Sequence, residues 1–126
     1  MIDLTGQWAG SYTYPGCLDP VPFTAEIREI DGQLSGVTSE PHEWDVGEEA
    51  NGTIAGKRSG THLQFTKLYV LQEDYPDPVF YFGSLDEDGC EVAGDWDIPG
   101  VWSGSFVMMR PRQPKVELAS EQTATV

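Results

Sequence analysis

The chain has 126 residues, the size of one domain, and 21 acidic against 7 basic residues give it a net charge of −14. This charge argues against nucleic acid as a partner, because phosphate contacts need a basic face, and equally against an anionic membrane surface. It permits a cationic partner, or it serves only to keep the protein soluble. The 14 glycines and 9 prolines predict many turns, which suits an all-β protein.

Eight segments have the composition of β-strands, and no window shows helical periodicity. Short hairpin signals, Asp31-Gly32, Ser59-Gly60 and Asp88-Gly89, lie between apolar runs. In chain order the predicted strands cover residues 7–14, 23–30, 34–39, 53–59, 62–71, 79–85, 91–98 and 101–110. We expect an all-β fold, an eight-stranded antiparallel up-and-down β-barrel, as one domain over residues 1–110. We expect the polar tail at 111–126 to be disordered or to lie on a neighbour.

A motif of one apolar residue, one small residue and one glycine recurs at residues 8–10, 34–36, 54–56, 92–94 and 102–104. Glycine weakens a strand unless the strand must bend or a neighbouring backbone comes close. Closing a small barrel requires both, so the motif supports a barrel, with chance in a glycine-rich chain as the alternative.

Loop lengths predict that the two ends of the barrel differ. The loops at 15–22, 40–52 and 72–78 are long and alternate with short turns, so we expect the long loops to form a mouth opposite a tight end. Ligand chemistry is expected at the mouth. Its acidic residues would attract a cationic ligand.

Strand alternation assigns side chains to the lumen, which is the barrel interior. If Trp8 points inward, so do Tyr12 and Tyr14. The same face of the fifth predicted strand carries Lys67 and Tyr69, and a buried ammonium must be paired. Lys67 is therefore a candidate ligand contact. The alternatives are a lysine that extends to solvent or one that pairs with a carboxylate such as Glu40 or Glu73.

No catalytic constellation is present, so we expect no enzyme and no cofactor. Residues 40–45 pack four metal-capable side chains together, but without a recognised spacing, and a solvated acidic loop is the simpler interpretation. His42 and His62 fall at opposite ends and neither points inward, which disfavours haem. The N-terminus has no basic segment followed by an apolar run, so a cytoplasmic protein is expected. Cys17 and Cys90 are also expected at opposite ends, too far apart for an intrachain disulfide.

Outward apolar residues recur on nearby strands, at Leu68, Val70, Phe80 and Phe82. Contiguous exposed apolar surface marks interfaces, so we expect a homo-oligomer. A bulge in the sixth predicted strand would instead turn Phe80 and Phe82 into the core.

The first predicted strand opens with Gly6-Gln7-Trp8, and the last predicted strand ends with Arg110. A tryptophan and an arginine at these places resemble the signature of the calycin group of barrels, which includes lipocalins, fatty-acid-binding proteins and avidins. Within it, Leu4–Trp8, Gly32–Gly36, Leu63–Tyr69 and Trp102–Phe106 are similar to avidin and streptavidin. The resemblance implies a barrel closed at the tight end by Trp8 beneath Arg110.

The sequence departs from avidins where they hold the ureido group of biotin. Gly10 stands where the resemblance implies an asparagine and Thr38 where it implies a tyrosine, whereas the aromatic walls Tyr69, Trp96 and Trp102 remain. A buried polar ligand group without partners costs about 1–3 kcal/mol, so tight biotin binding is not expected.

The sequence therefore predicts a non-catalytic barrel that binds an unknown small molecule, with a protein-interaction module with a filled lumen, or a small enzyme, as alternatives. The candidate ligand-binding residues are Tyr12, Tyr14, Thr38, Lys67, Tyr69, Trp96 and Trp102, and Trp8 and Arg110 are expected to be structural.

Overall fold

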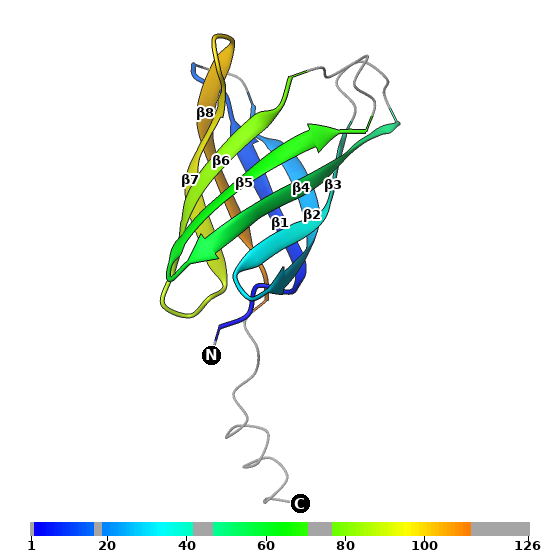
Figure 1. The fold of residues 1–126 in the computed structure, drawn as a ribbon. Coiled ribbons are helices and arrows are strands. Elements are labelled where there is room, and N and C mark those ends of the chain that lie inside the picture. The colour runs from blue at the N-terminus through cyan, green and yellow to red at the C-terminus, as the bar shows by residue number, and fades with distance from the viewer. Residues whose placement is uncertain (1, 17–18, 42–46, 71–76, 112–126) are drawn as a thin grey trace, which may run out of the picture.

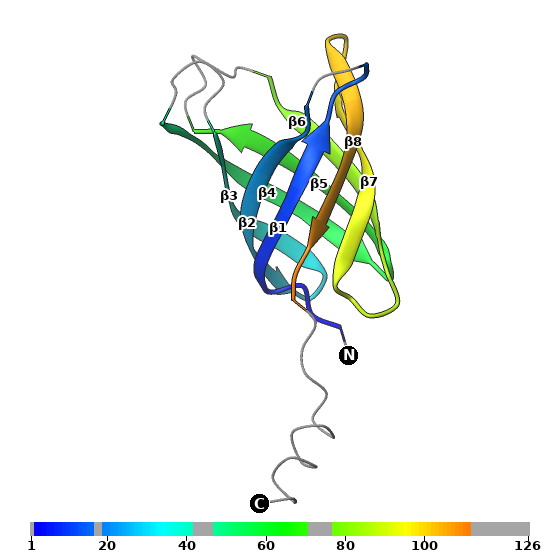
Figure 2. The same ribbon diagram turned by 180° about the vertical axis from the view of Figure 1, so that it is seen from behind.

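The protein folds as a closed β-barrel in which every neighbouring pair of strands is antiparallel (Figures 1 and 2). The computed structural model describes residues 2–16, 19–41, 47–70 and 77–111. Its strands are β1 (Gly6–Thr13), β2 (Val21–Ile30), β3 (Gln33–Pro41), β4 (Glu49–Ser59), β5 (His62–Tyr69), β6 (Val79–Leu85), β7 (Glu91–Ile98) and β8 (Trp102–Met109). They lie side by side in chain order, and β1 pairs with β8 to close the barrel. The predicted eight-stranded up-and-down barrel is confirmed.

The turns have the chemistry that their residues predict. Asp31 and Gly32 both have positive φ, 51° and 79°, as a type I′ hairpin turn requires. At the other end, Pro99-Gly100 joins β7 to β8, with Gly100 at φ 78° and a hydrogen bond of 2.9 Å from the Val101 amide to the Ile98 carbonyl. Proline followed by glycine of positive φ is typical of a type II turn.

The repeated glycines lie where neighbouring strands come closest. A Cβ at Gly56 would collide with the Gln64 carbonyl oxygen, and one at Gly94 with the Phe82 carbonyl oxygen. Gly10, Gly36 and Gly104 meet a neighbouring carbonyl oxygen in the same way. The recurring motif therefore reflects strand curvature and close approach rather than chance.

The core fills the tight end of the lumen. Trp8, Leu4, Val92 and Met108 are almost fully buried. The Arg110 guanidinium carbon lies 4.7 Å from the centroid of the Trp8 ring. The Arg110 side chain donates to the Gly89 carbonyl at 3.0 Å and to the Thr5 carbonyl at 3.3 Å, which ties the residue just after β8 to the β6–β7 turn and to the residue just before β1. Trp8 and Arg110 therefore close the tight end, as expected.

Strand boundaries near the mouth differ from the prediction. The sequence predicts a long loop from residue 40, but β3 continues to Pro41, which pairs with Glu49 at the start of β4. The fifth strand ends at Tyr69 rather than at residue 71. Because the ladder between β3 and β4 extends beyond the predicted ends, Glu40 becomes an inward-facing strand residue.

The described residues contain no helix that is long and apolar enough to cross a membrane.

Candidate functional site

A buried ion pair lies in the half of the lumen nearer the mouth. Lys67 Nζ on β5 is 3.0 Å from Glu40 Oε1 on β3, and the two residues are only 3% and 4% exposed. The Tyr69 hydroxyl donates to the same carboxylate oxygen at 2.9 Å, and the Tyr12 hydroxyl donates to the other oxygen. Both carboxylate oxygens therefore have donors, which is what a buried charge requires.

A glycine on the strand between them allows this pairing. Gly52 on β4 stands opposite Thr38 on β3 and Tyr69 on β5 in the ladder. A Cβ at Gly52 would lie 2.8 Å from Thr38 Oγ1 and 3.2 Å from Lys67 Cγ. Any larger residue would occupy the space through which side chains of β3 and β5 approach each other.

Aromatic rings surround the ammonium group. Lys67 Nζ lies 4.6 Å from the ring centroid of Tyr69, 5.1 Å from that of Tyr12 and 5.4 Å from that of Tyr81. Contacts of this kind are favourable and strengthen when the cation is desolvated. The lumen thus holds one positive charge inside a cage of three tyrosines and one carboxylate.

These surroundings determine the protonation states of the cage. Burial by itself lowers the pKa of Lys67, but Tyr81, Tyr69 and Glu40 more than offset this, and the pKa is raised overall. Burial raises the pKa of Tyr12, and raises that of Tyr69 against the opposing effect of the Lys67 ammonium. At neutral pH Lys67 is therefore a charged ammonium and both tyrosines are neutral hydroxyl donors.

Thr38 carries the one buried side-chain oxygen without a hydrogen-bond partner among the residues that the structure describes. The residue is 7% exposed and lies two positions before Glu40 on the inward face of β3. Leaving a buried hydroxyl unpaired costs roughly 1–3 kcal/mol, so this position has hydrogen-bonding capacity that the fold does not use.

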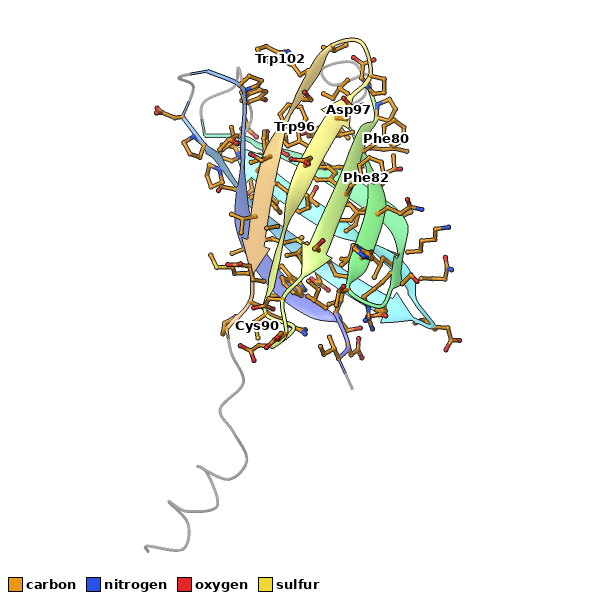
Figure 3. All side chains as sticks on the ribbon, turned by 90° about the vertical axis from the view of Figure 1, so that its left-hand side faces the viewer. Phe80, Phe82, Cys90, Trp96, Asp97 and Trp102 are labelled. Carbon is orange, nitrogen blue, oxygen red and sulfur yellow. The ribbon has the colours of Figure 1, made fainter. Side chains whose placement is uncertain are left out.

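A second group of aromatic side chains continues toward the mouth. Tyr14 packs edge-on against Trp96 and Trp102, with ring centroids 5.3 and 5.1 Å apart, and Tyr12 lies 6.0 Å from Trp96. Trp96 is buried, whereas Trp102 is 45% exposed at the start of β8 (Figure 3). A shallow hollow of about 350 Å³ beside Trp102 is lined by Pro15, Ile98 and other rim residues. The site therefore grades from a polar interior to an aromatic rim.

The structure brings four predicted site residues, Tyr12, Thr38, Lys67 and Tyr69, to one part of the lumen. Tyr14, Trp96 and Trp102 form the aromatic group above them. The sequence gives Glu40 two possible roles in a loop, as a partner of Lys67 and as one of four metal-capable side chains. The pairing with Lys67 is confirmed, but the loop placement is wrong. Tyr81 was missed, although its inward alternation between Val79 and Gly83 could have identified it.

Several other predicted features lie elsewhere. His62 is exposed near the tight end, and Cys90 there is a free thiol. Cys17, His42, Glu43, Asp45 and Glu73 lie outside the described residues. Within the described ranges, no group of histidine, cysteine and carboxylate side chains could hold a metal ion.

The comparisons with known proteins identify the architecture. No protein-family model and no curated protein matches the chain. A solved structure titled as the de novo design of a fluorescence-activating β-barrel is similar, with 13% sequence identity and a TM-score of 0.60. The similarity covers 88% of this chain and 100% of that chain. At this level of identity the likeness supports the barrel fold alone.

Proposed function

We propose that this protein is a non-catalytic barrel that binds a small molecule in the mouth half of its lumen. The observation that carries the proposal is the buried polar cage around Lys67 and Glu40 with the unpaired hydroxyl of Thr38 beside it. Replacing a buried ion pair by apolar residues of similar size is often neutral or stabilising, so folding alone does not require the cage. A ligand that hydrogen bonds to Thr38 would account for buried polar groups that folding does not require.

The ligand extends from the polar interior to the aromatic rim. Its polar group reaches Thr38 and the tyrosine hydroxyls, and its apolar body lies against Tyr14, Trp96 and Trp102. Sites of this composition, mostly apolar with a few placed polar groups, are typical of small-molecule binding.

The charges favour a neutral or cationic ligand. Glu40 and Lys67 neutralise each other, so an anion would find no uncompensated positive charge in the lumen. Described carboxylates near the mouth include Asp19, Glu48 and Asp77, whereas the described cations other than Lys67, namely Arg28, Lys57, Arg58 and Arg110, lie toward the tight end. A negative mouth concentrates cations and repels anions.

Binding without catalysis agrees with the protonation states. The raised pKa of Lys67 keeps its amine protonated and therefore not nucleophilic, and the raised pKa values of Tyr12 and Tyr69 keep them from acting as bases near pH 7. We further propose that the chain is a distant member of the calycin group, on the basis of the contact between Trp8 and Arg110. With Gly10 and Thr38 in place, biotin is not the proposed ligand.

Native mass spectrometry of the protein purified from its own host tests the proposal. We expect a small-molecule adduct on the wild type and its loss in the double variant Glu40→Gln, Lys67→Met. A matched control removes one charge of each sign from the outer face of β2, by Glu26→Gln with Arg28→Met. The adduct should survive in that control, and an adduct that survives in both double variants would place the ligand elsewhere.

A protein-interaction module is a second candidate, favoured by the packing of the tight half of the lumen. Phe65 stacks on Tyr81 at 4.8 Å, and Phe106 meets Tyr81 edge-on at 5.1 Å. In the mouth half, Tyr12 and Trp96 are buried as well. Protein that carries no small molecule from its host, and whose Trp96 and Trp102 fluorescence responds to no compound of a neutral and cationic library, would favour this candidate.

A further inference from the structure

One face of the outer wall, formed by β4, β5, β6 and β7, carries few charges. Directly opposed residues form three rows across these strands, here called the β4–β7 face. From the tight end upward, the rows are Ser59, His62, Ser84 and Ala93; Lys57, Gln64, Phe82 and Asp95; and Ala55, Thr66, Phe80 and Asp97. The ladder is regular through β6, so Phe80 and Phe82 point outward as predicted (Figure 3).

Small residues hollow this face. A groove of about 480 Å³ is lined by Gly83 and Gly94 together with residues of the first two rows, among them Lys57 and Phe82. An adjoining hollow of about 270 Å³ lies against Ala55, Phe80 and Phe82. Phe82 is 53% exposed between the two hollows. A large exposed aromatic ring beside a groove is the kind of surface that a protein partner covers.

We propose that the occupant of the β4–β7 face is the same face of a second copy, related by a two-fold axis that runs along the strands between β5 and β6. This symmetry turns each row onto itself in reverse order. Lys57 then faces Asp95 of the partner subunit, and Gln64 faces Phe82 of the partner subunit. Each pairing occurs twice, as in any isologous interface.

The order of residues along the rows favours this occupant. The middle row begins with the cation Lys57 on β4 and ends with the carboxylate Asp95 on β7. When the same row of a second copy lies over it in reverse order, each charge therefore meets an opposite charge. Asp97 faces Ala55 of the partner subunit, so no carboxylate opposes a carboxylate although the chain has a net charge of −14. Ser59 faces Ala93 of the partner subunit. Such small residues let the two sheets approach to the usual spacing of about 10 Å.

Sedimentation equilibrium of the full chain in roughly 0.15 M salt tests the proposal, because this ionic strength limits the repulsion between two acidic subunits. We expect a mass twice that of the 13.9 kDa chain at micromolar concentration. Lys57→Glu and Asp95→Lys should each raise the dissociation constant by at least about tenfold, because each places like charges opposite one another. The double variant Lys57→Glu, Asp95→Lys restores opposite charges and should return the constant to within about threefold of wild type.

Two further variants separate the interface from a loss of folding. Phe82→Glu should abolish the dimer, whereas Thr24→Glu, at an exposed position on β2 across the barrel, should leave it intact. Far-ultraviolet circular dichroism should be the same for both. A wild-type protein that stays at 13.9 kDa up to roughly 100 µM, or a dimer that the charge swap does not restore, would overturn the proposal. The proposal does not depend on what the lumen binds.

Discussion

Glu40 and Lys67 lie on strands that are not neighbours, and they meet across the glycine of the strand between them. Gly52 has no side chain to separate them, and Tyr12 and Tyr69 supply the donors that complete the carboxylate. The ion pair therefore depends on residues of β3, β4 and β5 together with Tyr12 of β1. Removing one of the interacting side chains leaves the others without a partner.

Lys67→Met alone should lower the free energy of unfolding by about 3–5 kcal/mol, because it leaves the Glu40 carboxylate buried without its cation. The double variant Glu40→Leu, Lys67→Met should be more stable than the single variant, since it removes both charges, but less stable than wild type, because the Tyr12 and Tyr69 hydroxyls lose their acceptor. Urea unfolding followed by tryptophan fluorescence measures both. A single variant as stable as the double variant would show that the carboxylate is not confined to the lumen.

Alkaline pH should destabilise the fold. The pKa values of Lys67, Tyr12 and Tyr69 are raised in the folded state, so folding retains protons that the unfolded chain releases above about pH 10. The stability from these groups is complete below the unfolded pKa values and is lost as the pH rises toward the folded ones. Each retained proton contributes about 1.4 kcal/mol per pH unit to this fall.

The control for this pH dependence removes one of the titrating groups. Urea unfolding is measured between about pH 8 and pH 11, on either side of the pKa values of tyrosine and lysine in the unfolded chain. The free energy of unfolding should fall less steeply with pH for Tyr69→Phe than for the wild type. Equal slopes would mean that the Tyr69 hydroxyl titrates alike in the folded and unfolded chains.

The closed end should behave as a coupled unit. Trp8→Ala should cost about 3–5 kcal/mol, as for other large core truncations. Arg110→Ala should cost less, through the lost stacking on Trp8 and the hydrogen bonds to Gly89 and Thr5. A double-mutant cycle should give a coupling energy of roughly 0.5–3 kcal/mol. Strict additivity would mean that the two side chains close the tight end independently.

Much of the barrel follows from local patterns, and the site follows only in part. Alternation from Trp8 correctly placed Tyr12 inward, and Asp31-Gly32 marked its hairpin, because both are properties of a few neighbouring residues. Glu40 falls in the predicted loop at 40–52, because an acidic stretch that contains Pro41 carries no strand signal of its own. Its burial depends on Lys67, which is distant in sequence, so no local pattern indicates it.

Thr38→Val should separate stability from binding. Valine has nearly the shape of threonine without the hydroxyl that lacks a partner among the described residues, so the free protein should gain up to about 1–3 kcal/mol in urea unfolding. The host-derived ligand should be lost or held more weakly in native mass spectrometry, because the ligand is proposed to supply the missing hydrogen bond. Ser39→Ala, on the opposite face of β3, removes a hydroxyl outside the lumen. It should change neither the stability nor the binding by as much.

A Thr38→Val protein that is less stable than wild type would show that the Thr38 hydroxyl is already satisfied in the free protein, for example by an ordered water. The ligand would then have to displace that water rather than fill an unused position.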